Sequence, residues 1–363
     1  MSAFGSDFTV GLEEELLLVD RETLALAPVT DDVLAVMRVG PREAGHDAYA
    51  AQIELRSAPS GSVPGAVSHL ARLREAALAA GATLLGAGLH PAAPLGDAEL
   101  VAGTRYEVVA EQLRGLLRRT PESALHVHVG LPDECAAVRV FNALRVHVPL
   151  LQGLAANSPY WFGADSGLAS ARFPLSRAYP GRCIPRALRD PDDLERLAGA
   201  TLTAAGLPDA TFLWWDLRVH PGYGTVEVRE MDAQSSLDHV AALAALVRAL
   251  ALEAVDAPPP PDVPSEALDW SAFRAARDGT AAVVLEGGTP RPLAEVARSA
   301  ILRLRPRARE VGDEDALDGI GAIIEKGGAA TQRAWHGAEG MAGLLRELAR
   351  ETARTGELSV RAG

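Results

Sequence analysis

The chain has 363 residues, of which 48% are hydrophobic and 23% are charged, enough to build a sizeable buried core. Its net charge of −13 argues against nonspecific binding to nucleic acid and against an anionic membrane surface. No apolar run reaches the roughly 18 residues that a membrane-spanning helix needs. The single lysine, Lys326, excludes a Walker A loop and argues against the ATP-grasp ligases, which generally place lysines over the nucleotide phosphates.

The N-terminus and the cysteines indicate a compartment. The first 20 residues carry acidic side chains rather than a basic n-region, which is unlike a signal peptide. Cys135 and Cys183 are far apart and form no CxxC pattern, which is typical of reduced thiols. We therefore expect a cytoplasmic protein.

Strand-like and helix-like patterns alternate along the first 256 residues. Strands are expected at 9–20, 51–57, 82–89 and 125–130, and helices at 63–80, 105–119 and 133–156. Residues 157–186 are rich in Pro, Gly and Ser and are expected to form a functional loop. A hairpin is expected from 212–220 and 225–232, followed by a helix at 237–255.

A proline run at 257–264 is a candidate linker. It divides the chain into a mixed part, 1–256, and a mostly helical part, 265–363, with three or four expected helices. We expect both parts to belong to one functional domain, 1–363.

Four of the strands share an unusual polar side. Since alternate residues of a strand face opposite sides, each carries one apolar stripe and one polar stripe. The polar stripes contain Glu13 and Glu15, Glu54 and Arg56, His126 and His128, and Glu227 and Arg229. A sheet with one solvated face would also alternate, but Thr, Ser, Lys and mixed charges would be expected there. The pattern favours an α+β fold in which the polar face of an antiparallel sheet lines a site.

This combination of side chains suits hard divalent cations. Carboxylate oxygens favour Mg²⁺ or Mn²⁺, and Mn²⁺ tolerates an imidazole best. Several glutamates with one or two histidines would neutralise two metal ions, which could bridge nucleotide phosphates. Arg56 and Arg229 are each two residues from a glutamate. They could bind phosphoryl or carboxylate oxygens, or pair with those glutamates, and the two roles are compatible.

Five segments, in this order, carry a family resemblance. They are TVGLEEELLLVD from Thr9, QIELRSAP from Gln52, HVHVG from His126, ANSPYWFGADSGLASAR from Ala156 and TVEVREMDAQ from Thr225. Together they resemble the type 2 glutamate–cysteine ligase family, also called YbdK-like carboxylate–amine ligases. The resemblance implies a glutamine-synthetase-like fold, with a curved antiparallel sheet and helices packed on its apolar face. It also implies a reaction in which ATP converts a carboxylate to an acyl phosphate and an amine then displaces phosphate.

The resemblance further implies roles for individual residues. Glu13, Glu15, Glu54, His128 and Glu227 match the metal ligands, and Arg229 matches the arginine that stabilises the transferred phosphoryl group. From its place on the polar face, Arg56 is also expected to be catalytic. His126 either binds metal or contacts nucleotide or substrate. Asn157, Trp161 and Arg172 belong to a wall over the amino-acid substrate, although Asn157 could instead cap a helix and Trp161 could be packing. Glu14 points the other way and is expected to form a structural ion pair, and His90 and His147 are expected to be structural.

The implied cofactors and partners are ATP, Mg²⁺ or Mn²⁺ and small amino-acid substrates, and similar proteins suggest a homodimer. The archetypal product is γ-glutamylcysteine, often formed slowly. Three alternatives stay open: the same mechanism on another carboxylate and amine, a metal-dependent amidohydrolase suggested by His126-x-His128, and an inactive binding protein.

Overall fold

The computed structural model describes residues 3–356. Its centre is an antiparallel sheet of seven strands, which are β1 (Val10–Leu18), β2 (Ala44–His46), β3 (Gln52–Arg56), β4 (Leu84–Leu85), β5 (Ala124–Gly130), β8 (Leu217–His220) and β9 (Thr225–Asp232). The strands lie in the order β2-β3-β1-β5-β9-β8, and β4 pairs with the end of β1. The four predicted polar strands, β3, β1, β5 and β9, are therefore immediate neighbours.

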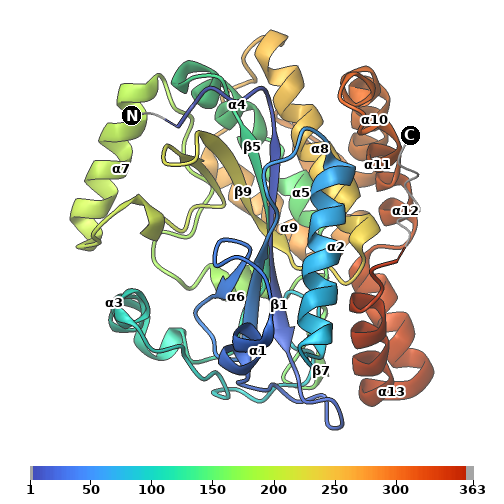
Figure 1. Cartoon of the computed structure of the whole chain (residues 1–363). Coiled ribbons are helices and arrows are strands. Elements are labelled where there is room, and N and C mark those ends of the chain that lie inside the picture. Colours follow the sequence, from blue (N-terminus) through green and yellow to red (C-terminus); the bar gives the residue numbers. More distant parts are fainter. Residues whose placement is uncertain (1–2, 357–363) are drawn as a thin grey trace.

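Helices pack on the apolar face of this sheet (Figure 1). They are α2 (Val63–Ala79), α4 (Glu134–Arg145), α5 (Val148–Leu154) and α8 (Leu237–Asp256). Helix α8 is buried along most of its length and contacts α2 and α4, so it is the central helix of the core. The apolar stripes of the strands enter this core, as with Leu12, Ile53, Val127 and Val228, each at most 1% exposed. The predicted α+β architecture is confirmed.

The start of α2 shows how local sequence sets an element boundary. The Ser62 side chain accepts a hydrogen bond from the backbone N–H of Gly65, and a proline occupies the first turn. Both features favour a helix start because they satisfy or remove the unpaired N–H groups there. Leu70 and Leu73 then fall on the buried face.

The expected helix at 133–156 is two helices. Helix α4 ends at Arg145, and α5 begins at Val148 with Pro149 in its first turn. Proline cannot donate a backbone hydrogen bond within a continuing helix and clashes with the preceding turn, which explains the break. The single-helix expectation was therefore wrong.

Three other boundaries also differ from expectation. The strand expected at 82–89 is reduced to β4, and at Gly86 the chain passes so close to the Gln234 carbonyl that no side chain would fit. The helix expected at 105–119 is α3 (Thr104–Leu113), which ends where Arg114 adopts a positive φ of 47°. The strand expected from 212 begins only at Leu217.

Further elements lie around the sheet. They are α1 (Thr30–Val36), β6 (Tyr160–Trp161), β7 (Ala164–Asp165), α6 (Arg172–Ser176) and α7 (Pro191–Ala205). Helices α3 and α7 lie on the side of the sheet opposite α2 and α8 (Figure 1). The segment between α5 and α7 is mostly irregular, as its Pro, Gly and Ser content predicts.

The C-terminal part contains more elements than expected. Its helices are α9 (Ser265–Asp278), α10 (Leu293–Glu310), α11 (Glu314–Asp318), α12 (Ile320–Glu325) and α13 (Gly328–Thr352). A hairpin of β10 (Val283–Glu286) and β11 (Thr289–Pro292) turns at Gly287 and Gly288, both at positive φ. Helix α9 packs on α5 and α10 on α8, so side chains from both sides of the proline run share one core.

Two buried ion pairs connect distant segments on the helical side. Arg74 binds both carboxylate oxygens of Glu14, at 2.7 and 2.9 Å, and donates to the backbone carbonyl of Thr352. Arg248 binds Asp313 at 2.8 Å. Glu14 points away from the polar face and thus has the structural role expected of it. Within residues 3–356, no helix is both long and apolar enough to cross a membrane.

Candidate active site

The strand register places the polar residues directly beside one another. Glu13 lies opposite Arg56 of β3 on one side and His126 of β5 on the other. In the next row, His128 lies opposite Glu227 of β9. Directly opposite residues in antiparallel strands project to the same face with Cβ atoms about 5 Å apart. The predicted polar face is therefore continuous across four strands.

Within this face, two groups of side chains are arranged as metal ligands. One contains Glu13, Glu54 and His126, and the other contains Glu13, His128 and Glu227. In each group, one ligand atom from every residue lies within 4.8 Å of the others. Two carboxylates with one imidazole suit Mg²⁺ or Mn²⁺. Glu13 belongs to both groups, which places the two candidate metal positions side by side.

His128 is oriented as a metal-binding histidine. Its Nδ1 lies 3.0 Å from the Thr225 hydroxyl, while its buried Nε2 has no hydrogen-bond partner. That Nε2 lies 3.5 Å from Glu13 and 3.6 Å from Glu227. A ligating histidine normally has its second nitrogen held in this way, so the residues present fit a bound cation.

His126 belongs to the other candidate metal group, with Glu13 and Glu54, and its contact with nucleotide or substrate stays a prediction. Its Nδ1 lies 3.2 Å from Glu13. Burial, followed by the charge of Arg229, lowers the pKa of His126 to about 4, so the imidazole is neutral at pH 7. A neutral imidazole is the form that binds metal. Of the two roles left open by the sequence, the geometry favours metal binding.

Glu15 belongs to neither group. One of its carboxylate oxygens accepts a hydrogen bond from the Ala124 backbone at 2.7 Å, and the other lies 3.5 Å from Nε2 of His126. Burial raises the pKa of Glu15 well above its ordinary value. Its metal role stays a prediction, and its present contacts orient His126.

Opposed charges divide the glutamates of the site into two types. Burial would raise the pKa of Glu227, but Arg229, His128 and Arg218 together hold it far below its ordinary value. By contrast, burial, followed by the charge of Glu13, raises the pKa of Glu54 to about 8 despite the ion pair with Arg56. Glu227 is therefore a permanent anion, whereas Glu54 needs a further positive charge to ionise fully at neutral pH.

The two predicted arginines form the ion pairs expected of them, and a third arginine joins them. Arg56 pairs with Glu54, and Arg229 with Glu227. Arg218 on β8 binds Glu227 at 2.8 Å. Sequence reasoning missed Arg218, although counting across the expected hairpin turn would have placed it opposite Glu227.

Asn157 and Trp161 of the predicted substrate wall make hydrogen bonds and packing contacts within the protein. The Asn157 side chain donates to the carbonyls of Gly86 and Ala233 and accepts from Gln332, so it neither caps a helix nor points into open space. Trp161 stacks on Phe162 and packs beside a small apolar cluster. Their contacts with substrate stay predictions.

Arg172 is a buried member of this wall. Its Nη1 donates to the Glu230 carbonyl at 2.9 Å and lies 3.6 Å from Asp232. Asp232 in turn accepts from the hydroxyls of Ser158, at 2.7 Å, and Ser170, at 3.0 Å. Arg172 is thus connected to the end of β9, next to the polar face.

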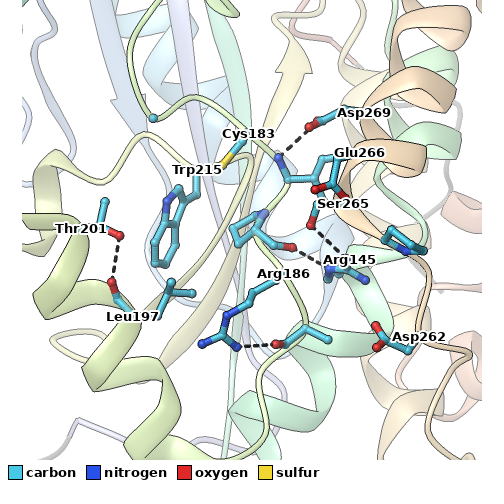
Figure 2. A pocket seen from close by; sticks show the side chains of 15 residues that line it. Arg145, Cys183, Arg186, Leu197, Thr201, Trp215, Asp262, Ser265, Glu266 and Asp269 are labelled. Atoms are coloured by element: carbon cyan, nitrogen blue, oxygen red, sulfur yellow. Dashed lines mark hydrogen bonds between the residues drawn. The ribbon is translucent and has the colours of Figure 1, made fainter. Parts of the chain in front are cut away.

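Outside the sheet, a pocket of about 640 Å³ lies between the loop before α7 and the start of α9 (Figure 2). Its lining includes Trp215, Glu266 and Asp269 but none of the predicted site residues. Arg145 is bonded there to the Pro185 and Val263 carbonyls, and Asp269 to the Ile184 N–H. These contacts hold the loop, and the residues of the two candidate metal groups do not line this pocket.

His90 and His147 lie outside the site, as expected. His90 bonds the Leu24 carbonyl at 2.8 Å, and burial lowers its pKa. Burial, followed by the charge of Arg303, also lowers the pKa of His147 to about 4. Neither histidine belongs to the two candidate metal groups.

The chain is similar to known proteins over nearly its whole length. The family model for glutamate–cysteine ligase family 2 matches residues 9–353. A glutamate–cysteine ligase from Natronomonas pharaonis is 33% identical, with 96% of this chain and 97% of the relative covered. One from Haloferax volcanii is 30% identical, with 95% and 97% covered.

A solved structure supports the fold. The glutamate–cysteine ligase of Francisella tularensis, in complex with AMP, superposes with a TM-score of 0.71 at 14% identity, covering 99% of this chain and 91% of that one. At that identity the likeness supports the fold alone, whereas the family model and the relatives cover nearly the whole chain. The chain belongs to glutamate–cysteine ligase family 2.

Proposed function

We propose that this protein is an ATP-dependent carboxylate–amine ligase that joins glutamate and cysteine to form γ-glutamylcysteine. The observation that carries the proposal is the pair of three-residue metal groups sharing Glu13 on the polar face. Family membership supports the reaction class, and it favours a ligase over the amidohydrolase suggested by His126-x-His128 alone. The same mechanism on another carboxylate and amine is the second candidate.

The reaction has two steps. A carboxylate oxygen of the substrate attacks the γ-phosphorus of ATP, the bond to the β-phosphate oxygen breaks, and ADP leaves. The amine nitrogen then attacks the acyl carbon of the acyl phosphate, loses a proton, and expels inorganic phosphate. Transfer of the phosphoryl group depends mainly on positioning and on stabilisation of the charge that develops.

The side chains of the polar face supply both requirements. Glu13, Glu54 and His126 would hold one Mg²⁺ or Mn²⁺ ion, and Glu13, His128 and Glu227 the other. Bound there, the cations would neutralise phosphate charge. Arg229 and Arg56 lie beside the two groups, each paired with one glutamate. Each guanidinium retains N–H groups that can donate to phosphoryl oxygens in a fixed planar geometry.

Glu15 would act with the metal groups, and Asn157, Trp161 and Arg172 would form the wall over the amino-acid substrate. Glu15 orients His126, and Arg172 holds the end of β9. We further propose that the protein acts in the cytoplasm as a homodimer, which size-exclusion chromatography with light scattering would test.

The function is tested by phosphate release from Mg-ATP with amino acids offered singly and in pairs. Release that requires glutamate and rises with cysteine supports the glutamate–cysteine reaction. Release with a different pair keeps the mechanism and changes the substrate. A folded protein that binds Mn²⁺ but releases no phosphate with any pair would contradict the proposal.

A further inference from the structure

Buried polar atoms without a hydrogen-bond partner gather at one end of the polar face. Among the described residues they include Nε of Arg172, Arg182 and Arg229 and both carboxylate oxygens of Glu230. Buried polar groups in proteins nearly always have a protein or water partner. A concentration of unpaired donors and acceptors in one place therefore indicates a polar ligand or ordered water.

A β-bulge brings Glu230 to this face. Leu125 of β5 lies opposite Met231, and Val127 lies opposite Val228, so His126 alone faces both Arg229 and Glu230. Met231 and Val228 both lie in the apolar core. The extra residue therefore leaves Arg229 and Glu230 on the polar side, as bulges beside active sites commonly do.

Two arginines flank the bulge and are held by its backbone. Arg172 Nη1 donates to the Glu230 carbonyl at 2.9 Å, and Arg182 Nη2 donates to the Arg229 carbonyl at 3.4 Å. Nε of Arg182 lies 3.2 Å from the Asp216 carboxylate in a geometry that makes no hydrogen bond. Both guanidinium groups are thus fixed in position while one N–H of each is left unpaired.

We propose that Glu230, Arg172 and Arg182 form the head-group site for an α-amino acid substrate, in which the Glu230 carboxylate binds the α-ammonium group and the two guanidinium groups bind the α-carboxylate. The proposal rests on the ligase function above and names the feature of the carboxylate substrate that this protein recognises. A zwitterionic head group supplies both kinds of missing partner at once, donors for Glu230 and acceptors for the arginines.

The position of Glu230 also fits the reaction. It lies three residues along β9 from Glu227, so the two residues are separated by at most about 10 Å along the strand. An amino acid held by its head group at Glu230 can therefore direct a side-chain carboxylate toward the metal groups. This favours an α-amino dicarboxylic acid over a simple dicarboxylic acid. Burial, followed by the charge of Asp216, raises the pKa of Glu230 to about 8, and a bound ammonium would supply the missing positive charge.

The test compares L-glutamate with glutarate, which has both carboxylates but no ammonium group. Their dissociation constants are measured by calorimetry with the wild type, Glu230→Gln and Arg182→Gln, in the presence of Mg²⁺ and a non-hydrolysable ATP analogue. We expect Glu230→Gln, which preserves side-chain shape, to weaken glutamate binding roughly 10- to 100-fold and to leave glutarate unchanged. Arg182→Gln should weaken both ligands.

Other outcomes would overturn the inference. They are equal binding of glutamate and glutarate to the wild type, no effect of Glu230→Gln, equal weakening of both ligands by that variant, or no binding of glutamate at all. Phosphate release measured on the same wild-type sample keeps the two proposals apart. If the wild type releases phosphate in response to glutamate but Glu230→Gln binds glutamate as tightly as the wild type, only the head-group proposal is contradicted. If the wild type releases no phosphate with any amino acid, the ligase function is contradicted.

Discussion

The buried Nε2 atom of His128 lies 3.5 Å from a carboxylate oxygen of Glu13, with no hydrogen-bond donor or acceptor to satisfy it. Because Glu13 also lies 3.2 Å from His126, one carboxylate connects the two histidines of the HVHVG strand. The face thus contains two candidate metal groups that share a ligand.

The shared ligand leads to a prediction about metal stoichiometry. We expect the wild type to bind two Mn²⁺ ions per chain, His128→Asn and Glu54→Gln to retain one tight ion each, and Glu13→Gln to weaken both by more than about 10-fold. Electron paramagnetic resonance titration of free Mn²⁺ measures this directly. Equal losses in all three variants would contradict a shared Glu13.

Glu54 and Glu227 should respond differently to the same substitution. Glu54 has a pKa raised to about 8, so Glu54→Gln replaces a mostly neutral group in the metal-free protein, and we expect little change in stability. Glu227 is buried between Arg218 and Arg229, and Glu227→Gln leaves both cations without their partner. We expect that variant to lose about 3–5 kcal/mol of unfolding free energy. Urea unfolding of both metal-free variants distinguishes the two, and equal stabilities would contradict the charge arrangement.

Arg229 should not tolerate replacement by lysine. A lysine keeps the charge but cannot donate from a planar fork to glutamate and phosphoryl oxygens at once. We expect Arg229→Lys to lower kcat by about 10²–10³-fold with a small change in melting temperature. Arg218→Lys is the matched control, since Arg218 also pairs with Glu227 but lies on the edge strand β8. Near-normal turnover by Arg229→Lys would remove its catalytic role.

The ion pair of Arg74 and Glu14 should matter for folding and not for chemistry. Arg74 is completely buried and bonds Glu14 together with the Gln234, Ser235 and Thr352 carbonyls. Glu14→Gln leaves that cation uncompensated, so we expect a loss of about 3–5 kcal/mol in unfolding free energy. The kcat of the fraction that remains folded should be unchanged. A loss of kcat with unchanged stability would contradict this expectation.

Glu230 gives the metal-free protein a distinctive pH dependence. Its folded-state pKa is raised to about 8, so between its ordinary value and pH 8 the folded protein holds a proton that the unfolded chain has released. Stability must therefore fall as pH rises through this window. In Glu230→Gln this contribution is absent, so its melting temperature relative to wild type should rise from pH 5 to pH 8 and then level off. A difference independent of pH would show that Glu230 is ionised in the folded protein.

Much of the polar face could be predicted because strand alternation is local. The alternation at Glu13 and Glu15, and at His126 and His128, identifies the site-facing side without knowledge of strand order. The order itself, which makes β3, β1, β5 and β9 neighbours, depends on pairing between distant segments and was not predicted.

Other features depend on contacts between distant segments. The bulge that turns Glu230 toward the face is defined only by the register of β9 against β5, and simple alternation would have placed Glu230 in the core. Arg182 lies in an irregular segment with no period to reveal its direction. The β10–β11 hairpin was missed because its strands are only four residues long, although Gly287-Gly288 is a turn signal.

Catalysis by the polar face is expected to proceed through an acyl phosphate. The most direct test of this expectation is a single incubation of the wild type with Mg-ATP, cysteine and glutamate labelled with ¹⁸O in the side-chain carboxylate, followed by mass spectrometry of the released phosphate. We predict one ¹⁸O atom in each phosphate, because the carboxylate oxygen that attacks ATP leaves with the phosphoryl group. Peptide formation with unlabelled phosphate would contradict it.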